Sequence, residues 1–225
     1  QFVEIRTSGN SLDFGDLTYA RQSTLGATGS SIRGIWGGGQ IHPANNNVMD
    51  FITFATTGNA QDFGDLTVAR RNLIGTGNQT RGLFAGGQTP TKQDVIDFVT
   101  IASTSDATDF SNLSVARSGL GAASSPTRGL FFGGNAPSGT DVIDFVTIAS
   151  ASNATDFGNL TAARAFAQGV SNKTRAAMIG GYNGSSTVNT IDFVTIASEG
   201  NATDFGDLIT AISNSQPASN SIIGL

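Results

Sequence analysis

Apolar runs separated by glycine, proline, asparagine and serine recur along the whole chain. In residues 117–160 this pattern predicts four short strands, over 118–124, 128–134, 142–148 and 154–160. The first strand is rich in small residues, and the second ends in a double glycine. The third carries apolar side chains on both faces, which requires cover on both sides. The pattern therefore indicates antiparallel sheets that stack face to face.

The phrase Asp-Phe-Gly-Asp-Leu-Thr, in closely related forms, marks the fourth strand of each unit. Its phenylalanines are spaced by 49, 47, 47 and 48 residues, at Phe14, Phe63, Phe110, Phe157 and Phe205. A fixed period of this length is typical of modular folds in which each unit packs on its neighbours. Four short strands per period describe one blade of a β-propeller. A solenoid of hairpins is the competing architecture.

The order of these features resembles the Kelch repeat. A double glycine follows an aromatic strand, the next two strands carry aromatics, and an arginine opens the following unit. The chain departs from Kelch repeats in having phenylalanine where they usually carry tyrosine (Phe98, Phe145, Phe193) or tryptophan (Phe110, Phe157). The resemblance covers essentially the whole chain and implies an all-β, Kelch-like propeller with four antiparallel strands per blade.

The recurrent phrase is also similar to repeats from virion proteins of marine bacteriophages. This second resemblance implies a virion or extracellular location, as part of a tail, fibre or capsid appendage. The partners implied are host-surface glycans or neighbouring virion or extracellular proteins.

The two ends of the chain supply complementary parts of one unit. Residues 2–5 read as a third strand, and residues 222–225 read as a second strand. We therefore expect residues 1–225 to form a single five-bladed domain in which a two-plus-two blade closes the ring and removes its open edges. This fifth unit is about 13 residues shorter than the repeat. Either the termini lie in its missing loop, or the chain is a slice of a longer polypeptide with more blades.

Charged residues recur at fixed positions in the units. An arginine opens each first strand and an aspartate lies in each third strand, and both are lost together in the fifth unit. We expect each arginine to cross the glycines of the second strand and pair with its aspartate. The predicted pairs are Arg21 with Asp50, Arg70 with Asp97, Arg117 with Asp144, and Arg164 with Asp192.

A second arginine set begins each second strand on the opposite rim, at Arg33, Arg81, Arg128 and Arg175. These side chains either line a channel mouth and bind anionic sugars, or cap the preceding turn and pack their stems on the blade. The second interpretation is favoured.

Composition excludes several function classes. The net charge is −5 and lysine occurs only at Lys92 and Lys173, so the basic stripe needed for nucleic-acid binding is missing. No apolar run approaches 18 residues, which argues against membrane insertion. Without cysteine, the chain has neither disulfides nor thiolate metal ligands.

Catalytic candidates are weak. Glycosidases need a unique pair of carboxylates, whereas the aspartates here repeat from unit to unit, which favours a scaffold role. His42 is the only histidine and lacks a second ligand or a nucleophile, so a solvated loop residue is the expectation. Acidic pairs such as Asp13 and Asp16 match no calcium loop, and turn capping is favoured. We expect no enzyme activity, cofactor or metal.

The loops between the second and third strands differ most between units, and function on repeat scaffolds resides in such loops. Their amides, hydroxyls and few aromatics suit neutral sugars or a protein partner. A loop face without any ligand, a lectin-like binder outside phage, an engineered consensus scaffold and a glycoside hydrolase remain alternatives. The candidate binding residues are Tyr19, Gln40, His42, Asn46, Gln88, Lys92, Asn135, Tyr182 and Asn183.

Overall fold

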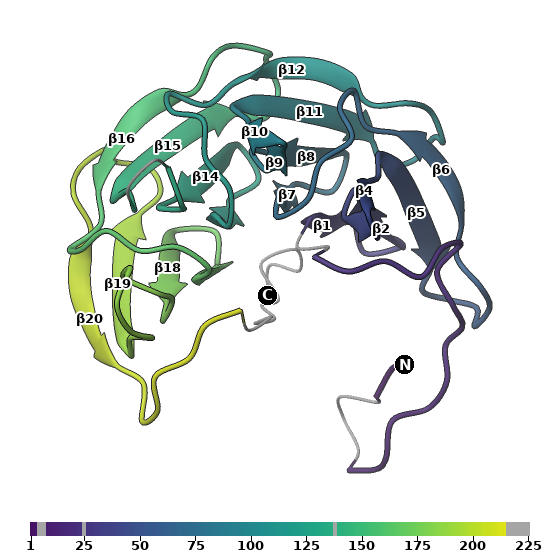
Figure 1. Ribbon diagram of the computed structural model, residues 1–225, viewed down its shortest axis with the longest axis horizontal. Helices are drawn as coiled ribbons and strands as arrows, with labels where there is room; N and C mark the ends of the chain where they lie inside the picture. Colours follow the sequence, from purple (N-terminus) through teal and green to yellow (C-terminus); the bar gives the residue numbers. More distant parts are fainter. Residues whose placement is uncertain (4–7, 24–25, 137–138, 215–225) are drawn as a thin grey trace.

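The computed structural model describes residues 1–3, 8–23, 26–136 and 139–214. This part of the chain contains four four-stranded antiparallel sheets, two short hairpins and no helix. Within each sheet the strands follow one another in chain order, from an inner to an outer strand. The four sheets form an arc around a common centre (Figure 1). The expected all-β class and the four antiparallel strands per unit are confirmed in these four units.

The strands of the first and second sheets are β1 (Gly26–Gly29), β2 (Arg33–Gly37), β5 (Val48–Thr53) and β6 (Gln61–Asp65), then β7 (Ile74–Gly77), β8 (Arg81–Ala85), β11 (Val95–Thr100) and β12 (Thr108–Asn112). The third and fourth sheets contain β13 (Gly121–Ser124), β14 (Arg128–Phe132), β15 (Val142–Thr147) and β16 (Thr155–Asn159), then β17 (Gln168–Ser171), β18 (Arg175–Ile179), β19 (Thr190–Thr195) and β20 (Thr203–Asp207). The hairpins are β3 (Gln40–Ile41) with β4 (Ala44–Asn45), and β9 (Gln88–Thr89) with β10 (Thr91–Lys92).

All four strands of the third unit are shorter than the sequence predicts. The third and fourth differ by one residue at one or both ends, and the two larger differences lie at glycines with left-handed φ angles. The inner strand of the third unit begins at Gly121, because Gly119 has a φ of 62° and interrupts the extended backbone before it. The next strand ends at Phe132, because Gly133 and Gly134 have φ angles of 53° and 113° and turn the chain away. The double glycine is therefore a turn rather than the end of a strand.

The apolar core lies between adjacent sheets. One cluster joins Leu83 and Ile96 of the second sheet to Phe110, Phe131 and Val146 from the same and the third sheet. Both faces of the third strand are covered as the pattern predicts, since Ile96 is fully buried and Val99 is 2% exposed. Stacking of sheet on sheet is what makes each unit depend on its neighbours.

The innermost strands approach one another closely. A Cβ added to Gly75 on β7 would lie 2.2 Å from the carbonyl oxygen of Ala27 on β1, and one added to Gly169 on β17 would lie 2.0 Å from that of Ala122 on β13. Side-chain hydroxyls cross the same contacts, as Thr28 donates to Thr76 O at 2.8 Å. The small residues expected in the inner strands are therefore required by crowding.

The fifth unit is described only in part. Phe2 pairs with Leu12, and the rings of Phe2 and Phe14 meet edge to face at 5.9 Å, as the corresponding phenylalanines do in the four sheets. Residues 4–5 of this predicted strand and all of the other predicted strand, residues 222–225, lie outside the described residues. Five blades and ring closure therefore stay predictions.

Candidate functional site

Four arginine–aspartate pairs are buried in the sheets at the positions that the repeat predicts. The nitrogen–oxygen distances are 2.7 Å for Arg21–Asp50, 2.9 Å for Arg70–Asp97, 2.9 Å for Arg117–Asp144 and 3.0 Å for Arg164–Asp192. The glycine of the adjoining turn makes room for the arginine stem, since a Cβ on Gly87 would lie 3.2 Å from Cδ of Arg70. The buried pair therefore requires glycine at this turn, because a side chain there would crowd the arginine.

Each aspartate receives further hydrogen bonds from the crossing that leads into its sheet. For Asp144 these come from the Ser114 hydroxyl at 2.6 Å and the Ser114 backbone N–H at 3.0 Å, and Thr67 and Thr161 bind Asp97 and Asp192 in the same way. Thr18 donates its hydroxyl to Asp50. Because both carboxylate oxygens are occupied, these aspartates are structural rather than catalytic groups.

The arginines also donate to backbone carbonyls, although the buried Nε atoms of Arg21, Arg117 and Arg164 have no hydrogen-bond partner among the described residues. Arg70 donates to Gly86 O at 2.8 Å and Phe84 O at 3.0 Å, and Arg117 donates to Val142 O at 3.1 Å. Burial lowers the pKa of all four arginines, and the charge of the paired aspartate raises it in opposition. The pairs are therefore closed electrostatic units with no part exposed to a ligand.

The second arginine set connects neighbouring sheets. The guanidinium groups of Arg33, Arg81, Arg128 and Arg175 lie 4.5–5.1 Å from the ring centres of Phe51, Phe98, Phe145 and Phe193. Arg33, Arg81 and Arg128 also donate to the carbonyls of Ile101, Ile148 and Ile196 in the next sheet, at 2.9–3.1 Å. These arginines therefore pack on the blade, as the favoured interpretation predicts. They also connect neighbouring sheets, which the sequence did not predict.

The candidate loop residues that directly follow the double glycines occupy equivalent positions, which we call the loop rim. Gln40, Gln88, Asn135 and Tyr182 each exchange two backbone hydrogen bonds, of 2.7–3.2 Å, with the residue after a buried arginine. Those partners are Gln22, Arg71, Ser118 and Ala165. The loop rim therefore brings variable side chains to the start of the inner strands, around the common centre.

The other candidates divide into two groups. Lys92 lies beside the loop rim, where its ammonium donates to Asn135 Oδ1 at 2.9 Å and to the Ala136 carbonyl. Asn46 and Asn183 use their side-chain oxygens to cap their own turns, by accepting from Val48 N and from Ser185 N and Ser186 N. The main role of these two asparagine side chains is therefore to stabilise their own loops.

Two exposed candidates stand apart from this hydrogen-bond network. His42 lies exposed in the turn between β3 and β4, and Tyr19 is 53% exposed in the crossing before Arg21. Tyr182, by contrast, belongs to the loop rim and is 40% exposed, with its hydroxyl donating to Gly184 O. Tyr182 is thus the aromatic surface that the loop rim offers to a ligand.

Sequence reasoning missed Gln22, Arg71 and Ser118. Each directly follows a buried arginine, and the doublet Arg70-Arg71 is a visible departure from the other units. The signal was therefore present in the chain. Its meaning depends on the double-glycine turn, which brings these residues beside the loops.

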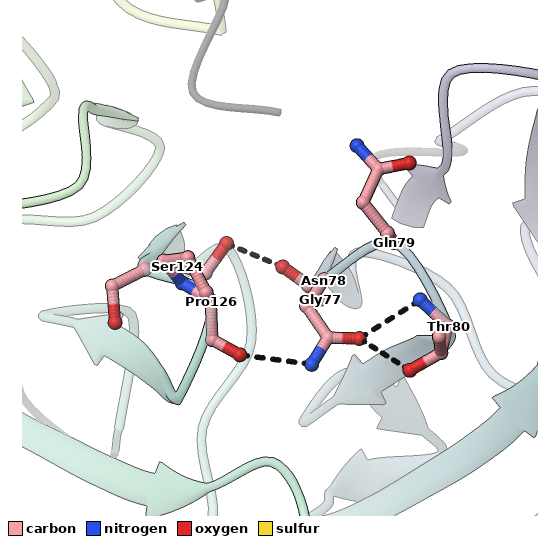
Figure 2. A pocket seen from close by; sticks show the side chains of 7 residues that line it. Gly77, Asn78, Gln79, Thr80, Ser124 and Pro126 are labelled. Atoms are coloured by element: carbon pink, nitrogen blue, oxygen red, sulfur yellow. Dashed lines mark hydrogen bonds between the residues drawn. The ribbon is translucent and has the colours of Figure 1, made fainter. Parts of the chain in front are cut away.

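A hollow of about 180 Å³ lies on the opposite rim, between the turns after β7 and β13 (Figure 2). Its polar groups bond mainly to one another: Asn78 Nδ2 donates to Pro126 O at 2.9 Å, Asn78 Oδ1 accepts from Thr80, and the Ser124 hydroxyl donates to Gly77 O at 2.6 Å. The hollow is a seam between two sheets, and the loop rim is the better candidate for binding.

The described ranges show no sign of a metal site. They contain no group of three or more histidine, aspartate or glutamate side chains that could hold a metal ion. None of their segments forms a helix long and apolar enough to cross a membrane. No protein-family model matches the chain, and a search of curated proteins finds no match.

Proposed function

We propose that this chain is a non-enzymatic interaction module that binds a glycan or a neighbouring protein through its loop rim. The observation that carries the proposal is that repeated and variable side chains have different places in the structure. The two sets of repeated arginines are used in buried pairs with aspartate and in contacts between sheets, whereas the residues that vary, Gln40, Gln88, Asn135 and Tyr182, share one rim. The resemblance to virion repeats favours a host-surface glycan and a virion or extracellular setting.

Replacing Tyr182 with alanine tests the proposal on a glycan array. The wild-type chain is expected to bind a subset of glycans, and the variant to bind them at least about tenfold more weakly, because an exposed aromatic ring is a stacking surface for sugars. Ile32→Ala is the matched control, since Ile32 is 63% exposed and lies in a turn on the opposite rim. An equal loss in both variants, or binding unaffected by Tyr182→Ala, would contradict the assignment.

We further propose that the sheets form a closed, five-bladed, Kelch-like propeller with two-plus-two closure. Five residues at equivalent positions have left-handed φ angles of 53–62°: Ser23, Asn72, Gly119, Phe166 and Asn214. Each accepts from the next through its carbonyl, in four backbone hydrogen bonds of 2.7–3.1 Å that follow the inner edge of the arc. This series leaves the Ser23 N–H and the Asn214 carbonyl at its two ends, and one more link between them would make it a ring of five.

The outer strands support the same closure. In three units, a Cβ on the outer-strand glycine would lie 2.3–2.5 Å from a backbone carbonyl in the turn of the next unit, as at Gly15, Gly64 and Gly158. Gly206 meets nothing within 4 Å, and its neighbour Phe205 is 63% exposed where Phe63, Phe110 and Phe157 are 2–4% exposed. The turn with the same sequence position in the N-terminal unit is Gly9-Asn10, which is the natural cover for Gly206.

A disulfide tests this closure without interference, because the chain has no cysteine of its own. In the described units, Asp65 N donates to Asp106 Oδ1 at 2.9 Å, and the equivalent pair across the proposed closure is Asp207 with Asn10. Asn10→Cys/Asp207→Cys is expected to form an intrachain bond on oxidation, visible as a mobility shift on a non-reducing gel. Asp65→Cys/Asp106→Cys is the matched control. Cross-linked dimers, or a bond in the control alone, would refute closure within one chain.

A further inference from the structure

Arg71 and Lys92 differ from nearly all other lysines and arginines of this acidic chain, because they neither form a buried pair nor pack on a phenylalanine ring. Of the 12 lysines and arginines, Arg6 lies outside the described residues, four arginines are in the buried pairs and four pack on phenylalanine rings. Lys173 is exposed in a turn on the opposite rim. Arg71 and Lys92 remain, and both belong to the second unit and adjoin Gln88 of the loop rim.

The backbone places both cations beside Gln88, from which the Arg71 side chain reaches Gln40 of the first unit and the Lys92 side chain reaches Asn135 of the third unit. Arg71 is paired with Gln88 by two backbone hydrogen bonds, and Gln88 is in turn the cross-strand partner of Lys92 in the β9–β10 hairpin. Neighbours directly opposite on antiparallel strands project to the same face. Within the described part of the chain, no carboxylate lies at salt-bridge distance from either cation. Two positive charges therefore share a polar rim in a protein whose net charge is −5.

The Arg71 side chain is held in place by an oriented amide. Its Nη1 donates to Gln40 Oε1 at 2.9 Å, and Gln40 is itself fixed because its Nε2 donates to Pro43 O at 3.3 Å. Gln22 Nε2 donates to the same Gln40 oxygen at 3.4 Å. Since Nη1 is the only guanidinium nitrogen of Arg71 with a partner among the described residues, Nε and Nη2 keep their donors for a ligand. Arg71 is half-buried, which reduces the conformational entropy lost on binding.

The geometry points to a saccharide that carries a carboxylate, such as a uronic acid residue, as the ligand of the loop rim, with Arg71 as its anchor. This inference rests on the proposed function and specifies its ligand. A planar guanidinium with free Nε and Nη2 donors matches the two oxygens of a carboxylate. Lys92 adds a second positive charge in the same unit, and the amides of Gln22 and Gln88 offer the hydrogen bonds that sugar hydroxyls use. Tyr182 lies on the same rim in the fourth unit, where it offers a ring face to a longer saccharide.

Titration calorimetry with three probes tests the inference: tri-galacturonic acid, its methyl ester and the neutral galactose trisaccharide. The wild-type chain is expected to bind the acid at least about tenfold more tightly than the ester, with an advantage that shrinks in high salt. Arg71→Gln is expected to abolish this advantage, because it weakens binding of the acid far more than binding of the ester, and Arg71→Lys to keep part of it. Lys173→Gln removes the same charge from the opposite rim and should leave all three affinities unchanged.

The outcomes separate the two proposals. If the neutral sugar or ester binds as well as the acid, or if Arg71→Gln keeps the preference, the anionic site is refuted while glycan binding stands. If Lys173→Gln reduces the preference equally, a general charge effect replaces Arg71 as its cause. If no saccharide binds, both glycan proposals are overturned, and binding of an acidic peptide would then support a protein as the partner of the loop rim. Thermal unfolding of each variant checks that the fold is intact, since the backbone bonds of residue 71 do not depend on its side chain.

Discussion

Replacing Asp144 with alanine is expected to lower the free energy of unfolding by about 3–5 kcal/mol, because the variant leaves Arg117 charged, buried and unpaired. Both side chains of this pair are 0% exposed, so water cannot replace the lost carboxylate without opening the sheet. The Ser114 hydroxyl and N–H lose their acceptor as well. Urea denaturation followed by circular dichroism measures the effect.

Asp109→Ala is the control for this variant, since Asp109 is an exposed aspartate on the outer strand β12 and should change stability by less than about 0.5 kcal/mol. The double variant Arg117→Met/Asp144→Leu should recover part of the lost stability, because it removes both buried charges. The recovery should be incomplete, because the Ser114 donors remain unpaired. If Asp144→Ala were as stable as Asp109→Ala, the buried pair would have no structural role.

Alanine at Gly169 is expected to destabilise the protein by at least about 3 kcal/mol. The added Cβ would lie 2.0 Å from the carbonyl oxygen of Ala122, and the obstacle is backbone, which cannot rotate away as a side chain can. Strands β13 and β17 would have to separate, and the core between the third and fourth sheets would loosen with them. Gly75→Ala should act in the same way between β1 and β7. The urea midpoint measures both effects.

Gly139→Ala provides the comparison, since the nearest atom to its added Cβ is Cβ of Ala163 at 4.0 Å. This variant should unfold at nearly the wild-type urea concentration. If Gly169→Ala lowered the urea midpoint as little as Gly139→Ala, the inner strands would not be in close contact in solution.

The repeat allowed much of the scaffold to be predicted from sequence. Strand boundaries were correct to within a few residues, because glycine and proline mark them, and the joint loss of arginine and aspartate at Ile212 and Gln1 identified the buried pairs. Contacts that depend on distance in space were missed. Nothing in the phrase Leu-Thr-x-Ala-Arg indicates that Thr67 donates to Asp97, 30 residues away.

The candidate site was predicted less completely than the scaffold. Choosing variable loops led to Gln40, Gln88, Asn135 and Tyr182, which the structure places at equivalent positions. It also led to Asn46 and Asn183, whose side chains cap turns, because composition alone does not separate a capping amide from one that is free to bind. Arg71 was overlooked because its role comes from the neighbours that the turn brings to it.

The hydrogen bonds of the crossings have a consequence for how such a chain can change length over evolution. Asp97 takes its partners from Thr67 and Arg70, which both lie in the crossing that enters its own sheet. A segment from Thr67 to Leu113 therefore contains a complete buried charge cluster. Unequal recombination between two copies of the outer-strand phrase would add or delete one such segment without leaving an unpaired charge, so the gene can gain or lose whole sheets in single steps.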